Sequence, residues 1–168
     1  FLTKVVALIE DEGRAHVVLT GGSVGIEVLE AIAHSPGRDS VAWSAVHLWW
    51  GDERWLPRGD ADRNETQARH ALIDHIAIPP HNVHAFPASD DGIELETAAE
   101  RYEEALRAHA DGAEFPTFAI TFLGVGPDGH IASLFPDREG PTIERASVIA
   151  VHDSPKPPPG RLALTPPL

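Results

Sequence analysis

The sequence predicts an α/β fold in which an open, mostly parallel sheet carries helices on both faces. Short apolar segments rich in β-branched and aromatic residues, such as 46–50 and 118–123, alternate with longer segments of helical periodicity. Glycine-rich or charged turns follow several of these strand-like segments, which is where ligands bind in open α/β sheets. The length of 168 residues is enough for a hydrophobic core, and we expect residues 1–168 to form a single α/β domain.

The individual elements follow from composition and periodicity. Apolar, β-branched and aromatic segments predict strands at 17–19, 46–50, 83–86, 118–123, 148–151 and 161–165. Apolar residues at helical spacing predict helices at about 24–32, 64–76 and 94–109. Asp62 or Asn64 is a candidate N-cap for the second of these helices.

Composition argues against several classes of partner. The chain has no cysteine, which excludes disulfides, thiolate metal sites and cysteine nucleophiles. The net charge of −13 argues against nucleic acid or an anionic membrane as a partner. No apolar run approaches the roughly 20 residues of a membrane span, and no signal-peptide pattern is visible. We therefore expect a cytoplasmic protein that is a monomer or a weak homo-oligomer.

The two ends of the chain resemble cuts. The sequence begins at Phe1 without a methionine and stops at Leu168, just after a strand-like segment. We expect the domain to be truncated at both ends.

Residues 117–136 carry the first site candidate. The strand-like segment 118–123 is followed by three glycines at 124, 126 and 129, which let the backbone turn sharply and approach a ligand. Asp128 and His130 lie in and just after this glycine turn. Histidine is the side chain that titrates nearest to neutral pH, so an acid and an imidazole at a strand end form a candidate acid–base pair.

The same glycines match the dinucleotide-binding pattern G-x-G-x-x-G, which requires a helix directly after them. Pro136 limits any helix there to about one turn, and the strand comes late in the chain instead of opening a βαβ unit. We therefore expect no nicotinamide or flavin cofactor. No H-x-H or H-E-x-x-H spacing supports a metal site, and we expect none.

A second site candidate, Gly21-Gly22-Ser23, lies between the strand at 17–19 and the first predicted helix. A strand, glycine turn and helix in this order offer free backbone N–H groups and a helix dipole to an anion such as phosphate. The alternative is that two glycines simply make a tight turn between the strand and the helix.

Charged residues follow two further strands. Asp52 and Arg54 come after one of them, and Lys156 and Arg161 come after another. Together with the glycine turns, they place an anion-binding loop, an acid–base pair and several cations at one edge of the sheet. Such a set fits chemistry on a sugar phosphate. Glu53, between Asp52 and Arg54, is expected to be solvated surface.

Five motifs in order and spacing resemble the 6-phosphogluconolactonases of the glucosamine-6-phosphate isomerase/6-phosphogluconolactonase family. They are Leu-Thr-Gly-Gly-Ser at 19–23, Trp-Gly-Asp-Glu-Arg-Trp-Leu-Pro at 50–57, an Asp/Asn element ending at Asn64, Gly-Val-Gly-Pro-Asp-Gly-His-Ile-Ala-Ser-Leu-Phe-Pro at 124–136 and Asp-Ser-Pro-Lys-Pro-Pro at 153–158. The resemblance covers nearly the whole chain. Glucosamine-6-phosphate deaminases share the Gly-Gly-Ser and Asp-Gly-His elements but differ from this chain after them.

The resemblance implies a Rossmann-like sheet of the glucosamine-6-phosphate isomerase type. It also implies hydrolysis of 6-phospho-D-glucono-1,5-lactone to 6-phosphogluconate, a step of the oxidative pentose phosphate pathway. The family usually has an aspartate where Ala119 stands here, and it continues for a further strand–helix segment with a Gly-x-x-Lys element near the phosphate. The resemblance therefore implies that the site in these 168 residues is incomplete.

The resemblance also implies roles for single residues. His130 would be the catalytic residue, acting as general base on water and then as general acid on the ring oxygen. Arg54 and Asp52 would lie at the lactone, with Arg54 stabilising the oxyanion. Either Asp128 or Asp52 could fix the imidazole tautomer.

The phosphate of the substrate would be held by the Gly21-Gly22-Ser23 loop together with Lys156. Arg161 is a further candidate for this role. Holding this remote group would orient the reacting carbon against His130.

Two other functions remain as alternatives. One is a sugar-phosphate isomerase or deaminase that uses Asp52 as a base. The other is a sensor on the same fold that binds a sugar phosphate without turnover.

Overall fold

The computed structural model describes all residues except 111, 139, 146 and 168. Within the described residues, the α-helices are α1 (Leu2–Glu12), α2 (Ser23–His34), α3 (Asn64–Ala71) and α4 (Leu95–Ala108). The strands are β1 (Ala15–Leu19), β2 (Val46–Trp50), β3 (Asp52–Arg54), β4 (Phe118–Thr121), β5 (Val148–Val151) and β6 (Arg161–Leu164). Short 3-10 turns occupy Pro36–Ser40, Trp43–Ala45, Ile73–His75, Pro80–Asn82 and Gly140–Thr142.

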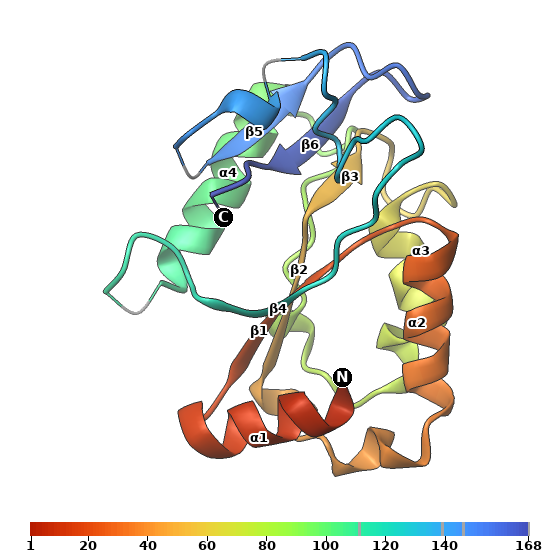
Figure 1. The fold of residues 1–168 in the computed structure, drawn as a ribbon, viewed down its shortest axis with the longest axis vertical. Coiled ribbons are helices and arrows are strands. Elements are labelled where there is room, and N and C mark those ends of the chain that lie inside the picture. The colour runs from red at the N-terminus through yellow and green to blue at the C-terminus, as the bar shows by residue number, and fades with distance from the viewer. Residues whose placement is uncertain (111, 139, 146, 168) are drawn as a thin grey trace.

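A parallel sheet with strand order β2-β1-β4 forms the centre of the molecule (Figure 1). The central strand, β1, is buried along its whole length and pairs with β2 in continuous register from Ala15–Val46 to Leu19–Trp50. Such a strand is mostly apolar because both faces of the sheet are covered. The α/β fold class predicted from the sequence is therefore confirmed.

An antiparallel sheet with strand order β3-β6-β5 adjoins the parallel one, and the sequence did not predict it. Gly51 joins the sheets, because its N–H donates to the Leu19 carbonyl in one and its carbonyl accepts from Leu164 in the other. β5 and β6 are joined by a loop without a crossover helix, so they run antiparallel.

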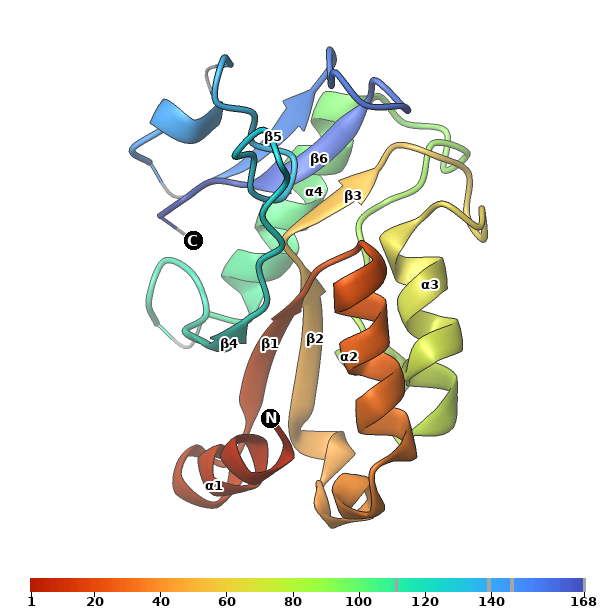
Figure 2. The same cartoon turned by 45° about the vertical axis from the view of Figure 1, so that its right-hand side comes forward.

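The helices lie on opposite sides of these sheets. Figures 1 and 2 show α2 and α3 side by side on one side, with α4 on the other. Tyr102 of α4 ties this helix to the core, since its hydroxyl accepts a hydrogen bond of 2.9 Å from the Trp50 backbone N–H. Both side chains are fully buried, so α4 is fixed against β2.

The helix predicted at about 64–76 begins at Asn64 as predicted, but its C-terminal end and its N-cap differ from the prediction. It ends at Ala71, and a 3-10 turn follows at Ile73–His75. Neither Asp62 nor Asn64 is its N-cap: the cap residue is Arg63, which makes no capping bond from its side chain. The carboxylate of Glu53 instead accepts from the backbone N–H groups of Asn64 and Glu65, at 2.7 and 2.9 Å.

Three further local predictions are corrected by the structure. Glu53 is not solvated but only 1% exposed, because it satisfies the free donors at the start of α3. Residues 83–86 do not form a strand, although Val83 makes one parallel bridge to Leu48. The N-terminal helix α1, which carries only one fully buried side chain, Val5, was not predicted.

Among the described residues, every helix is too short or too polar to cross a lipid bilayer.

Candidate active site

A cleft of about 710 Å³ opens at the carboxyl ends of β1 and β4, beside the antiparallel sheet. Every residue that the sequence proposed for the site except Asp128 lines it, namely Gly21, Gly22, Ser23, Asp52, Arg54, His130, Lys156 and Arg161. The cleft forms here because the parallel strands end at the same edge and each gives way to a polar turn. The predicted grouping of these side chains is thus present in the structure.

A tight turn after β4 presents His130. The Gly126 N–H donates to the His130 carbonyl at 2.8 Å, and the Gly129 N–H donates to the Gly126 carbonyl at 2.9 Å. A Cβ atom on Gly126 would lie 2.0 Å from the imidazole of His130, so only glycine fits beneath this ring. No helix follows this turn within residues 130–138, so the glycines do not form the strand–turn–helix of a dinucleotide site.

His130 forms a short hydrogen bond with Asp128, which lies just outside the lining of the cleft. The Nδ1 atom of His130 donates to Oδ1 of Asp128 at 2.6 Å, which leaves Nε2 with a free lone pair. This hydrogen bond is the main cause that lowers the pKa of Asp128. The Lys156 ammonium lies 3.4 Å from the same carboxylate oxygen. Of the two acids that could orient the imidazole, Asp128 is the one in contact with it.

Asp52 is engaged elsewhere in the cleft wall. Its carboxylate accepts from the Ser133 hydroxyl at 2.6 Å and from the Asn64 amide at 3.2 Å. Burial raises the pKa of Asp52, while the bond from Ser133 and the nearby guanidinium of Arg161 act in the opposite direction. With 6% of its surface exposed, Asp52 is a fixed and largely desolvated carboxyl at the edge of the cleft.

Sequence reasoning did not propose Ser133 or Asn64 as site residues, although both hold Asp52. Ser133 is 81 residues away from Asp52 in sequence, and no local pattern signals such a contact. Asn64 ends one of the five motifs shared with the family, and this was the sequence feature that could have identified it as a site residue. Asn64 also packs against the Gly21-Gly22-Ser23 turn, since a Cβ atom on Gly21 would lie 2.0 Å from Oδ1 of Asn64.

The Gly21-Gly22-Ser23 turn leads directly into α2. Gly22 is the N-cap with a φ of 83°, a left-handed conformation that favours glycine. No side chain caps the helix, and its first intrahelical backbone bond is donated by Ile26. The backbone N–H groups before Ile26 therefore have no acceptor within the helix. They lie at the N-terminal end of this 12-residue helix, which borders the cleft and is the positive end of the helix dipole.

The two arginines of the cleft differ in what they contact. Arg54 donates to the Asp62 carbonyl, while its buried Nε atom has no partner within the described residues. Arg161 donates from Nε to the Pro158 carbonyl at 3.0 Å and from Nη2 to the Pro157 carbonyl at 2.8 Å. Burial lowers the pKa of Arg161. Arg161 thus holds the loop that carries Lys156.

Comparison with known proteins assigns the class. The whole chain, residues 1–168, matches the family described as glucosamine-6-phosphate isomerases/6-phosphogluconolactonase, and the protein belongs to this family.

Several of the relatives it matches are named 6-phosphogluconolactonase. The chain is 48% identical to 6-phosphogluconolactonase of Streptomyces coelicolor over 169 aligned residues, covering 98% of this chain and 65% of that protein. It is 46% identical to the Mycobacterium tuberculosis protein of the same name over 162 residues, covering 95% and 65%. The structure of 6-phosphogluconolactonase from Thermotoga maritima matches with a TM-score of 0.83 at 31% identity, covering 97% of this chain and 68% of that one. The chain thus spans 65% of the length of these two curated relatives.

Proposed function

We propose that the protein hydrolyses 6-phospho-D-glucono-1,5-lactone to 6-phospho-D-gluconate. The observation that carries this proposal is the imidazole of His130, which is oriented by Asp128 and exposes a free Nε2 lone pair at a cleft that also contains a helix N-terminus. Such a cleft offers an acid–base group at one point and an anion-binding group at another. The names of the relatives support the same substrate.

The mechanism needs no covalent intermediate because a lactone is an activated ester. Nε2 of His130 takes a proton from water as the water oxygen attacks C1, and Asp128 stabilises the imidazolium that forms. The imidazolium then protonates the ring oxygen as its bond to C1 breaks. Arg54, which lines the cleft, would stabilise the tetrahedral oxyanion, an effect typically worth about 3–4 kcal/mol for each donor.

The phosphate of the substrate would bind at the start of α2. The backbone N–H groups of Gly22 and Ser23 have no helical acceptor, and the dipole of α2 favours an anion there. Lys156 lies within 3.4 Å of Asp128, so its pairing with phosphate would require its exposed side chain to rotate. Arg161 makes three bonds to its own loop, which favours a role in positioning Lys156.

The test is lactone hydrolysis by the protein and by its His130→Ala variant, with the spontaneous rate subtracted. We expect a loss of kcat of at least about a hundredfold, which is the low end of the general acid–base contribution. The exposed His34→Ala variant is the matched control and should keep the full rate. Equal rates for the His130→Ala variant and the unaltered protein would refute the role of His130 as general base.

Asp52 keeps the isomerase or deaminase alternative open, because a buried carboxyl with a raised pKa is a suitable base. Its carboxylate already accepts two hydrogen bonds, however, which favours a positioning role. A structural match to a monomeric glucosamine-6-phosphate deaminase, at 18% identity and a TM-score of 0.70, shows a shared fold alone. Release of ammonia or formation of a keto sugar, with no hydrolysis above background, would favour this alternative. Ligand binding without any turnover would instead indicate the sensor.

The expected partners and location remain predictions from the sequence. They are a small phosphorylated lactone as ligand, no nucleic acid or membrane partner, a monomeric or weakly associated state and a cytoplasmic location. The net charge of −13 supports the absence of nucleic-acid binding. Light scattering coupled to size-exclusion chromatography measures the oligomeric state directly.

A further inference from the structure

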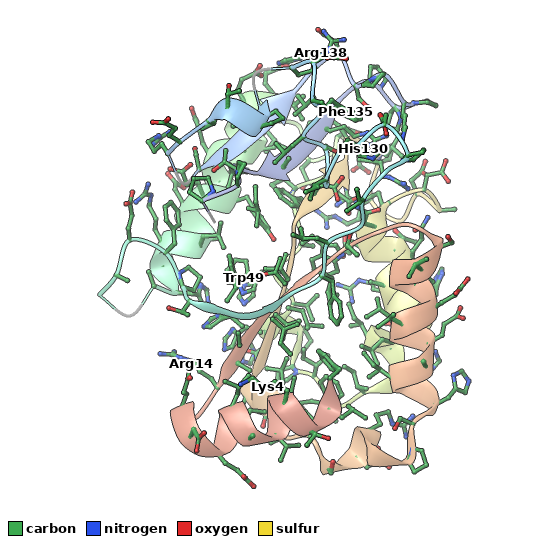
Figure 3. The ribbon with its side chains drawn as sticks, viewed as in Figure 1. Lys4, Arg14, Trp49, His130, Phe135 and Arg138 are labelled. Carbon is green, nitrogen blue, oxygen red and sulfur yellow. The ribbon has the colours of Figure 1, made fainter. Side chains whose placement is uncertain are left out.

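Three histidines that are far apart in sequence meet beside the parallel sheet, away from the cleft. One ring nitrogen from each of His47, His84 and His109 lies within 4.8 Å of the other two. His47 is in β2, His84 follows Val83 in the segment that runs beside β2, and His109 is the C-cap of α4. None of the three lines the cleft. Figure 3 shows Trp49, which packs on two of them, well apart from His130.

We propose that this histidine cluster, His47, His84 and His109, binds a divalent transition-metal ion such as Zn²⁺. Imidazole nitrogen is a favoured ligand of zinc, copper and nickel. Zinc–nitrogen bonds of about 2.0–2.1 Å place two nitrogens of a tetrahedral site roughly 3.4 Å apart. Nδ1 of His47 and Nε2 of His84 already lie 3.0 Å apart in a hydrogen bond to which one of them donates. Small ring rotations, together with a change of tautomer that moves this hydrogen to the other nitrogen of its ring, would admit the ion. Three protein ligands leave a fourth position for water.

A backbone hydrogen bond orients His109 for this role. Its Nδ1–H donates to the Ala105 carbonyl at 2.8 Å, so the lone pair remains on Nε2. Histidines that ligate metals almost always donate their other ring N–H to a carbonyl, a carboxylate or water, which fixes the tautomer and the ring. His109 therefore has the outer contact that a metal ligand needs.

The remaining rings are held in place by stacking. The indole of Trp49 stacks on His84 with ring centroids 3.8 Å apart and an interplanar angle of 11°. The imidazole of His16 stacks on His47 at 4.8 Å, and its Nδ1 atom accepts from the Trp49 indole N–H. These contacts restrict the ligand side chains before an ion arrives, which reduces the entropy lost on binding.

The binding of an ion should depend on pH, because a ligating imidazole must be neutral and protons therefore compete with the metal at low pH. One cation, the guanidinium of Arg14, interacts with the ring of His47. The charge of Arg14 opposes a cation, so the affinity must come from the three imidazoles.

The experiment is a calorimetric titration of the purified protein with ZnCl₂ after treatment with a chelator, together with the visible spectrum of the Co²⁺ complex. We expect one ion per chain and a Co²⁺ spectrum of tetrahedral or five-coordinate type. His47→Ala and His109→Ala should each weaken Zn²⁺ binding at least about tenfold. His34→Ala, at an exposed histidine, should leave it unchanged.

A second control separates this cluster from the cleft. Zn²⁺ should bind equally well to the His130→Ala variant, since His130 belongs to the cleft and not to the cluster. Absence of binding to the unaltered protein, or its loss in His130→Ala alone, would overturn the proposal.

Should the alanine variants fail to fold, the imidazole ¹⁵N resonances of the unaltered protein answer the same question. Zn²⁺ must then shift the resonances of His47, His84 and His109, whereas shifts confined to other histidines refute the assignment.

Discussion

Asp52 and Glu53 are neighbours in β3, and their two buried carboxyls serve different parts of the molecule. Successive side chains of a strand point to opposite faces. Asp52 therefore reaches the cleft, where it accepts from Ser133, whereas Glu53 reaches the start of α3, where it accepts from two backbone N–H groups. A shift of one residue in this strand would exchange the two roles.

At Asp128, we predict that replacement by asparagine lowers kcat at least about tenfold with a small change in KM. The carboxylate now accepts from Nδ1 of His130 and would stabilise the imidazolium, and a neutral amide loses this charge. Steady-state kinetics on the lactone measures the effect. The exposed Asp74→Asn variant is the control and should behave as the unaltered protein. A raised KM with unchanged kcat would contradict the role and place Asp128 in substrate binding.

At Asp52, we predict a pH-dependent gain in stability on replacement by asparagine. Burial raises the pKa of this carboxyl above the value of 3.8 expected for the unfolded chain. At a pH between the pKa of Asp52 in the unfolded chain and its pKa in the folded protein, the folded protein binds a proton that the unfolded chain lacks. The free energy of unfolding therefore falls as the pH rises through this range, and it stays lower at higher pH. Asp52→Asn should therefore be the more stable protein at pH 7, since each tenfold difference in proton affinity between the folded and unfolded chain corresponds to about 1.4 kcal/mol.

Urea unfolding between pH 4 and pH 8 measures this difference, which should shrink as the pH falls towards 4. The same variant should lose hydrolytic activity, because the cleft loses the carboxyl group of Asp52. A variant that is less stable at every pH would show that the bonds from Ser133 and Asn64 outweigh the cost of burial.

At the scale of elements, α3 depends on a side chain from outside the helix. Its first N–H groups are capped by Glu53, and the buried Arg63 lies 3.7 Å from the same carboxylate. Arg63 also lies 3.3 Å from Glu65, so the start of the helix contains two acids around one buried cation. The start of α3 is therefore stabilised by a side chain of β3.

We predict that Glu53→Gln lowers the free energy of unfolding by about 2–3 kcal/mol, because one acceptor and one charge beside the buried Arg63 are lost. Chemical denaturation measures this loss. The matched control is Glu100→Gln at an exposed position of α4, which should change stability by less than about 0.5 kcal/mol. An unchanged free energy of unfolding for Glu53→Gln would mean that Glu65 and the backbone carbonyls of Leu56 and Phe86 satisfy Arg63 without the charge of Glu53.

These elements also show what a sequence can predict. The polar turns at Gly21, Asp52 and His130 could be assigned because each follows an apolar strand directly, and parallel strands bring their ends together. The capping by Glu53 and the contact of Ser133 with Asp52 join segments that are distant in the chain. No local periodicity encodes such pairs, nor does it encode that β6 runs antiparallel beside β3.

At the scale of the whole molecule, the cleft places a few cations inside a strongly acidic protein. Arg54, Lys156 and Arg161 line it, while the chain as a whole carries a net charge of −13. The two effects would act over different ranges: the cations would attract an anionic substrate at short range within the cleft, whereas the net charge would repel it from a distance. Salt screens the distant repulsion first.

We therefore predict that kcat/KM for the anionic lactone rises as ionic strength is raised from about 0.01 M to 0.1 M, where the Debye length falls from about 30 Å to about 10 Å. Over this range the repulsion by remote carboxylates is screened, while contacts within the cleft are largely kept. Initial rates at low substrate concentration, in NaCl and at constant pH, measure the trend. A Lys4→Glu variant, altered at an exposed residue of α1, should show a steeper rise than the unaltered protein. If kcat/KM instead falls steadily from the lowest salt concentration, the prediction is wrong. The cations of the cleft would then control how fast the substrate associates with the protein, and the acidic surface would not.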